Sequence, residues 1–253
     1  MDCIPFDTVF LHAMVRDKQG RKMSKTLGNV IDPLDVIEGI DIEDLHAKLH
    51  KGNLDKSEIA RAIKGQKEQF PKGIPICGTD GLRFALLAYT SQGRDINLDI
   101  QRVVGYRQFC NKLWNATRFA LINLEDFELS SLDQIALLEY ESLEIPQKWI
   151  LSKLNAAIVK MDYAMESFDM SAATSVCYSF WLYELCDVYL ELMKPIMKAD
   201  ISLMGVKERK VSAQRVLYIC IEIGLRLLHP MMPFVTEELW HRLPARSLVP
   251  EET

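Results

Sequence analysis

The sequence predicts a mainly α-helical protein, in which a short α/β lead-in is followed by an antiparallel helix bundle. From about residue 79 onward, apolar residues recur every three or four positions, which is the spacing of amphipathic helices. Before that point, Phe6–His12 has the apolar, partly β-branched character of a short buried strand or of a strand-to-helix junction. The hydrophobic content of 49% and the charged content of 26% are ordinary for a globular protein.

The lead-in is expected to consist of turns and short helices. Asp17–Arg21 is a polar run with a glycine, which predicts a tight turn. The pair Asp32-Pro33 predicts a helix start, and Gly39 marks the expected end of that helix. Residues 41–78 are rich in Lys, Glu and Asp. They predict a surface insertion with one or two short solvated helices, followed by an extended connector around its prolines.

The bundle is expected to contain five long helices and one short helix. Thr79 or Asp80 is expected to cap the first helix and Gly93 to end it, while Pro195 is expected to end or kink the fourth. The Met and aromatic side chains at helical spacing are interpreted as the core of the bundle. The expected helical segments are 79–93, 103–124, 146–165, 171–194, 216–227 and 233–240.

Composition and charge exclude several classes of protein. No apolar run approaches the roughly 20 residues that cross a bilayer. The N-terminus lacks the basic and apolar regions of a signal peptide, so we expect a cytoplasmic protein without a membrane partner. The net charge of −5 gives no support for a dedicated nucleic-acid binder. The alternative that basic residues gather on one face of the folded chain is left open.

Neither a disulfide framework nor a metal site is expected. No two cysteines form a C-x-x-C pair, and their apolar neighbours favour reduced, mostly buried thiols. His46 and His50 lie four positions apart and could share one face of a helix, but no third ligand is near. The six cysteines are Cys3, Cys77, Cys110, Cys177, Cys186 and Cys220.

One loop carries a concentration of cations and hydroxyls. Arg21, Lys22 and Lys25 lie within five residues, together with Ser24 and Thr26, and glycines flank the segment. Ammonium groups and backbone amides of this kind can gather around a polyphosphate. By residue chemistry alone, a plain solvated turn is the more common alternative.

The five residues Lys22-Met23-Ser24-Lys25-Thr26 resemble the K-M-S-K-S motif of class I aminoacyl-tRNA synthetases. Longer flanking runs, which follow one another in order along nearly the whole chain, resemble the valine–tRNA ligase family. Leucine and isoleucine ligases share the architecture, but the runs at 91–97 and 109–116 favour valine. The matching runs are Phe10–Asp17, Gly20–Leu34, Cys77–Phe84, Thr90–Asn97, Phe109–Thr117, Phe180–Asp187 and Leu228–Trp240.

This resemblance implies a fold and a two-step reaction. Residues 1–78 would be the end of a Rossmann-like catalytic domain, and residues 79–253 an anticodon-binding helical bundle. Valine and ATP would give valyl-adenylate and pyrophosphate, after which the valyl group would pass to tRNA(Val). By analogy with the family, Lys25 would contact the phosphates with Lys22 in support, while Ser24 and the backbone would hold the loop closed. Mg²⁺ would arrive with ATP as substrate and needs no protein cage.

The contacts to tRNA are expected on or beside the second bundle helix, with no DNA partner. For each of these residues singly, an ordinary solvated side chain is the alternative, and the aromatic side chain that would stack on a base is left open. The candidates are Arg94, Arg102, Arg107, Lys112 and Arg118.

The chain also departs from the family pattern. Thr26 replaces the last serine and retains its hydroxyl, and Gly81 stands where alanine is usual. None of the five histidines begins an H-x-G-H motif, and the editing insert is absent. We therefore expect a C-terminal fragment that is inactive alone. The alternatives are a stand-alone tRNA-binding module and a degenerate structural remnant.

Overall fold

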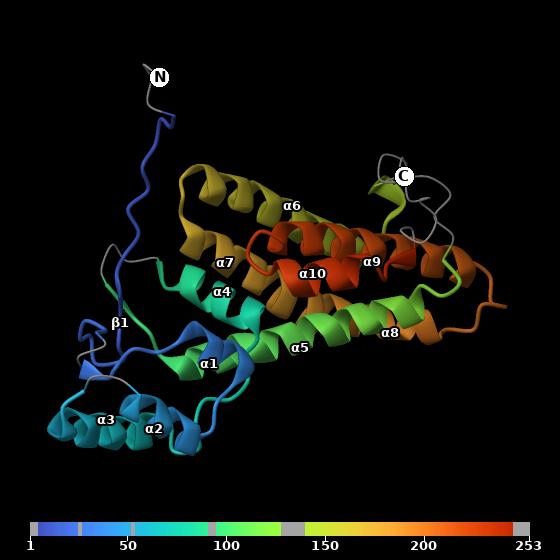
Figure 1. Cartoon of the computed structure of the whole chain (residues 1–253). Helices are drawn as coiled ribbons and strands as arrows, with labels where there is room; N and C mark the ends of the chain where they lie inside the picture. The colour runs from blue at the N-terminus through green and yellow to red at the C-terminus, as the bar shows by residue number, and fades with distance from the viewer. Residues whose placement is uncertain (1–4, 25–26, 52–53, 91–94, 128–139, 245–253) are drawn as a thin grey trace, which may run out of the picture. The chain divides into compact units, whose positions relative to one another are not determined.

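The computed structural model describes residues 5–24, 27–51, 54–90, 95–127 and 140–244 (Figure 1). These residues form two compact units. The first unit contains residues 1–107 with 166–171, and the second contains residues 108–165 with 172–253. The proposed domain boundary between residues 78 and 79 stays a prediction.

The only strands of the described residues form a small parallel pair in the first unit. β1 (Val15–Arg16) pairs with β2 (Ile96–Asn97), so that Val15 lies opposite Ile96. The prediction of a buried strand or a strand-to-helix junction at Phe6–His12 is wrong, since this segment has no regular structure and Leu11 is 88% exposed. A strand of this kind is buried only where neighbouring strands and helices cover it. The described residues place β2 beside Val15 and Arg16 only.

Three helices follow, and the first of them confirms the start and the stop expected in the lead-in. α1 (Pro33–Glu38) begins where the Asp32 carboxylate accepts the Leu34 backbone N–H at 3.0 Å, and Gly39 follows its end. α2 (Ile42–His50) and α3 (Lys56–Gln69) form the two helices expected of the polar segment, and they pack on each other.

The polar segment is less superficial than predicted. α3 buries no residue, but α2 buries Leu45 and Leu49. The expected extended connector contains a turn, in which the Gly73 N–H donates to the Phe70 carbonyl at 2.9 Å. Because Phe70 and Ile74 are buried in the core of the first unit, this segment anchors the helix pair to the rest of the unit.

Two further helices belong to this part of the chain. α4 (Thr79–Ala88) is capped by Gly78, and not by Thr79 or Asp80 as predicted. Gly78 has a φ of 74°, a conformation that glycine adopts at no steric cost. α4 ends at Ala88, before the predicted stop at Gly93, which lies outside the described residues. α5 (Ile100–Asn123) confirms the second expected helix.

The core of the first unit is a single cluster contributed by α1, α2, α4, the start of α5 and the segments between them. Met23, in the loop after β1, packs against it. The buried members are Val36, Leu45, Phe70, Ile74, Cys77, Leu82, Ala85, Leu98, Ile100 and Val103.

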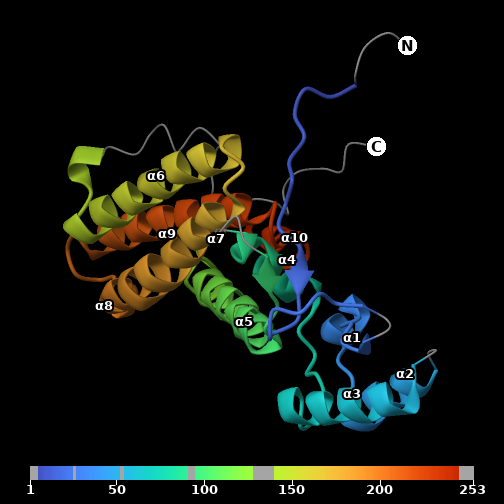
Figure 2. The ribbon, with the colours of Figure 1, turned by 90° about the vertical axis from the view of Figure 1, so that its left-hand side faces the viewer.

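The second unit is the helix bundle that the periodicity predicts. Its central helix is α9 (Val206–Leu228), which contacts α8 (Leu190–Lys198) and α10 (Pro233–Trp240). α6 (Ile145–Glu166) lies beside α9 in both views of the chain (Figures 1 and 2). α7 (Met170–Ser179) begins the fourth expected segment.

Between α7 and α8 the same segment continues as a π-helix, Phe180–Tyr189. At its end the Leu190 N–H donates to the Leu185 carbonyl, a spacing of five residues. Pro195 lies inside α8, which runs on to Lys198, so Pro195 does not end the helix. The alternative, that Pro195 kinks it, stays a prediction. The first turns of α8 are supported by buried Leu190 and Met193.

Buried polar ties connect α9 to its neighbours. The Gln214 amide donates to the Asn123 carbonyl at 2.7 Å and to the Asp126 carboxylate at 2.6 Å. The indole N–H of buried Trp181 donates to the Gly224 carbonyl at 3.1 Å. These bonds fix the rotation of α9, because two of them join a side chain to one particular backbone carbonyl and the third joins Gln214 to the Asp126 carboxylate.

Candidate functional site

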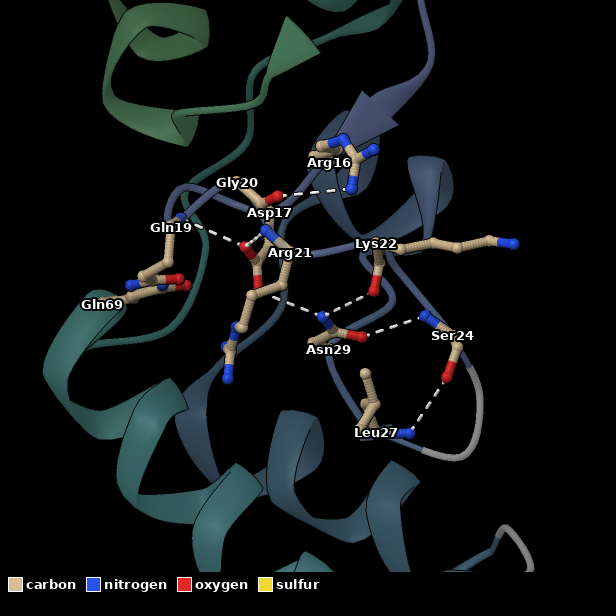
Figure 3. A network of polar contacts seen from close by, with 10 residues as sticks. All are labelled: Arg16, Asp17, Gln19, Gly20, Arg21, Lys22, Ser24, Leu27, Asn29 and Gln69. Carbon is tan, nitrogen blue, oxygen red and sulfur yellow. Dashed lines mark hydrogen bonds and ion pairs between the residues drawn. The ribbon is translucent and has the colours of Figure 1, made fainter. Parts of the chain in front are cut away.

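The loop between β1 and α1 is organised around the carboxylate of Asp17 (Figure 3). This side chain is 3% exposed. It accepts hydrogen bonds from the backbone N–H groups of Gln19 at 3.1 Å and Arg21 at 2.8 Å, and from the Arg21 guanidinium at 2.7 Å. The turn is closed by the Gly20 N–H, which donates to the Asp17 carbonyl at 2.9 Å. The tight turn predicted at this position is confirmed.

Asn29 extends this network to the far side of the loop. Its amide nitrogen donates to the Asp17 carboxylate at 3.0 Å and to the Lys22 carbonyl at 3.3 Å. Its amide oxygen accepts the Ser24 backbone N–H at 3.0 Å. One asparagine therefore ties the Asp17 turn to the backbone of the loop at two points.

The surroundings of Asp17 favour its charged form. Burial by itself raises the pKa of this carboxyl, but the hydrogen bonds from Asn29 and Arg21 and the charge of Arg21 outweigh burial. The pKa of Asp17 consequently lies below its ordinary value. At neutral pH the network is therefore held by a carboxylate, which is a stronger acceptor than a neutral carbonyl.

The ATP-loop residues predicted from the sequence have different environments. Lys22 is exposed, and its side chain extends away from the Asp17 and Asn29 network (Figure 3). Met23 packs against the core, and the Ser24 hydroxyl accepts the Leu27 N–H at 3.3 Å. The predicted residues Lys25 and Thr26 lie outside the described residues.

An open cavity of about 670 Å³ lies on the α3 side of the loop. Both acidic and basic side chains line it, among them Asp17, Arg21, Asp32 and Arg61. At one end the Gln69 amide donates to the Gln19 side chain at 2.8 Å. A water-accessible space lined in part by charged side chains therefore lies between the loop and α3.

The predicted tRNA-binding residues do not gather on one face. Arg102 and Arg107 belong to the first unit, and Lys112 and Arg118 to the second; all four are exposed on α5. At about 100° per residue, the two members of each pair lie roughly 120° to 140° apart around the helix. Arg102 stacks over the Tyr89 ring at 4.4 Å. Arg94 lies outside the described residues.

The described residues contain no group of three His, Cys, Asp or Glu side chains that could hold a metal ion. His46 is half-buried and His50 is exposed on α2. The five described cysteines are free thiols, and all but Cys186 are buried. Cys3 lies outside the described residues.

The sequence reasoning did not single out Asp17 or Asn29. Both lie inside the runs that carry the family resemblance, but their side chains act on backbone groups several positions away. Asp17 precedes a glycine turn, which is a position where Asp often bonds the following backbone N–H groups. That local signal could have identified Asp17, whereas the 12-residue separation of Asn29 from Asp17 has no comparable local pattern.

Comparison with known proteins places the chain in a family. Residues 1–99 match the family model described as "tRNA synthetases class I (I, L, M and V)". Residues 147–253 match the model described as "Anticodon-binding domain of tRNA ligase". These two matches lie on the loop region and on the greater part of the helix bundle.

The chain is also similar to valine–tRNA ligases from distant organisms. It is 55% identical to the enzyme of Homo sapiens over 245 residues, covering 96% of the chain and 19% of that protein. Identity is 53% with the Schizosaccharomyces pombe enzyme, with 96% of the chain and 24% of that protein covered. Identity is 52% with the mitochondrial enzyme 1 of Arabidopsis thaliana, with 96% of the chain and 21% of that protein covered. The chain thus spans about a fifth of the length of these relatives.

A solved structure shares the fold. The LeuRS of Agrobacterium radiobacter K84, solved in a ternary complex with tRNA and LeuAMS, matches with a TM-score of 0.55 at 21% identity. The match covers 91% of this chain and 21% of that chain.

The described residues contain no helix long and apolar enough to cross a membrane. On the two family models and the ligase relatives together, the chain belongs to the class I tRNA synthetases and is homologous to a segment of the valine–tRNA ligases.

Proposed function

We propose that this chain takes part in the ATP-dependent attachment of valine to tRNA(Val) through valyl-adenylate. The observation that carries the proposal is the cationic loop after β1, held by Asp17 and Asn29, in a chain 55% identical to a valine–tRNA ligase over 96% of its length. Because the chain matches about a fifth of that relative, the proposal assigns two parts of the reaction to it. These parts are contact with the ATP phosphates and contact with tRNA.

At the loop, the proposed chemistry is electrostatic. Negative charge develops on the phosphates as pyrophosphate leaves, and cations held in place stabilise that charge in the transition state. Lys25 is proposed to contact the phosphates and Lys22 to support it, and the exposure of Lys22 is compatible with this role. Mg²⁺ is proposed to arrive with ATP as a substrate complex, since it binds phosphate oxygens with few protein ligands.

In the bundle, the proposed ligand is tRNA(Val). The match of residues 147–253 to an anticodon-binding domain supports this assignment. Arg94, Arg102, Arg107, Lys112 and Arg118 stay the proposed phosphate contacts. A cytoplasmic location is proposed as well, although some of the relatives are mitochondrial enzymes.

Two titrations of the full chain test the proposal. Binding of MgATP is expected to weaken about tenfold or more in Lys25→Ala, because a charge-assisted contact contributes roughly 1.5 to 3 kcal/mol. Lys72→Ala is the matched control, since Lys72 is an exposed lysine of the same unit outside the loop. Equal MgATP affinity of the wild type and Lys25→Ala would remove the phosphate role from this loop.

The tRNA part is tested separately. Binding of tRNA(Val) is expected to fall steeply with salt, and Arg118→Ala to reduce the salt slope by about one. Lys198→Ala, an exposed cation on α8, is the control. Absence of salt-dependent binding would exclude the tRNA role and favour a structural remnant. Salt-dependent tRNA binding without MgATP binding would instead support a tRNA-binding module.

ATP–pyrophosphate exchange with valine is expected to be absent for the chain alone. Detection of exchange would contradict the proposal that the chain supplies only the phosphate contact and the tRNA contact.

A further inference from the structure

We propose that Asp17 and Asn29 are positioning residues for the ATP step. Together they form a latch that holds the backbone of Lys22 and Ser24. This inference rests on the proposed function, because it assigns the latch a role in presenting the loop to ATP. Neither residue belongs to the five-residue motif that was expected to bind the phosphates.

Hydrogen bonds connect the two residues of the latch to each other and to the backbone around them. The buried Asp17 carboxylate accepts from two backbone N–H groups, from Arg21 and from Asn29. Asn29 uses its amide nitrogen for two carbonyl or carboxylate oxygens and its amide oxygen for one N–H. An asparagine amide engaged on both sides can adopt only one orientation, since exchanging its N and O atoms would break all three bonds.

The latch acts on the loop's backbone and leaves the exposed Lys22 side chain unengaged (Figure 3). The Lys22 carbonyl and the Ser24 N–H are its two points of attachment, and they lie on either side of Met23. Met23 in turn packs against the core of the first unit. Three consecutive residues are therefore fixed, and they end directly before Lys25. Such an arrangement sets the position from which Lys22 reaches a ligand.

The latch lies outside the hydrophobic core cluster of the first unit. Neither Asp17 nor Asn29 is a member of the core cluster, and α1 is capped by a different carboxylate, that of Asp32. Removing the Asn29 amide is therefore expected to loosen the loop while the unit stays folded. This separation allows a positioning role to be distinguished from a purely structural one.

The central variant is Asn29→Ala in the full chain, with Gln69→Ala as its matched control. Gln69 bonds the Gln19 side chain in the same network but touches neither Lys22 nor Ser24 (Figure 3). In Asn29→Ala, trypsin cleavage after Lys22 and Lys25 is expected to accelerate about tenfold, from the loss of the amide's hydrogen bonds. Cleavage after Lys72 and the behaviour of Gln69→Ala are expected to stay at wild-type values. The melting temperature of Asn29→Ala is expected to fall by only a few degrees, because the core cluster is intact.

The same variant is then titrated with MgATP. A folded Asn29→Ala chain is expected to bind MgATP about tenfold more weakly, whereas a purely structural role would leave the MgATP affinity of the folded chain unchanged. Accelerated cleavage with unchanged MgATP affinity would overturn the positioning role. If the wild-type chain itself binds no MgATP, the proposed function fails instead, and cleavage still reports whether the latch exists.

Hydrogen exchange of the unmodified chain tests the latch even if Asn29→Ala does not fold. The Ser24 amide is expected to exchange at least tenfold more slowly than an unprotected backbone amide, because its N–H is bonded to Asn29. A Ser24 amide that exchanges at the unprotected rate would overturn the proposal.

Discussion

Gly28 lies at the point where the loop meets the α2 and α3 helices. Its φ is +61°, and a Cβ built on it would lie 3.1 Å from both Ala62 and Leu54. Backbone strain and crowding therefore act together at this position. We expect Gly28→Ala to lower the free energy of unfolding by roughly 1 to 3 kcal/mol, measured by urea denaturation.

Gly65→Ala is the control for this prediction. Gly65 lies inside α3, and no atom lies within 4 Å of the Cβ it would gain. Because alanine is the better helix former, this variant is expected to raise the stability by about 0.5 to 1 kcal/mol. Equal effects of the two substitutions would show that the loop does not pack on the helices as the structure has it.

At the residue scale, sequence reasoning found what local patterns encode. The Asp32-Pro33 helix start and the Asp17–Arg21 turn are confirmed because their hydrogen bonds connect near neighbours. Gly78 was missed as the cap of α4, since Thr79 and Asp80 are the commoner capping residues and nothing local indicates a positive φ. Asn29 was missed because its hydrogen bond to Asp17 joins residues 12 positions apart, which only the folded loop brings together.

The π-helix Phe180–Tyr189 is held at its start by Trp181, which is 1% exposed and donates to the Gly224 carbonyl. Trp181→Phe removes this donor and leaves unfilled volume against α9. We expect a loss of about 2 to 4 kcal/mol in the free energy of unfolding. Tyr183→Phe, on the exposed side of the same helix, is expected to change stability by less than about 0.5 kcal/mol. The free energy of unfolding of both variants is measured by denaturation monitored with circular dichroism. Comparable losses in the two variants would contradict this packing.

At the element scale, helical periodicity predicted the existence of the bundle helices but not their internal geometry. An apolar repeat of three and four residues is common to α- and π-helical turns over short stretches, so the π-helix could not be read from it. The strand predicted at Phe6–His12 failed for a different reason. A strand is defined by its partner, and the pairing of Val15 with Ile96 joins distant parts of the sequence.

For the whole molecule, the thiols report on global unfolding. Burial raises the pKa of Cys177 to about 12 and that of Cys186 to about 11, and it also raises the pKa of Cys220. The thiolate is the reactive form, so these groups stay protonated and unreactive at pH 8.5 while the second unit is folded. Alkylation with iodoacetamide, followed by mass spectrometry, is expected to label them only when denaturant unfolds the chain. Rapid labelling of Cys177 or Cys220 under native conditions would show that the bundle core opens locally.

The pairing of β1 with β2 has a consequence for the order in which the molecule forms. Arg16 of β1 forms an ion pair with Asp95, the residue directly before β2, and the two are 79 positions apart. At a ribosome speed of roughly 5 to 20 residues per second, the second partner is synthesised about 4 to 16 s after the first. Throughout that interval the strand that leads into the cationic loop lacks β2 as its partner, and closing so long a segment is entropically unfavourable. The loop therefore acquires its final anchorage only after its own residues and those of α1 to α4 have been synthesised.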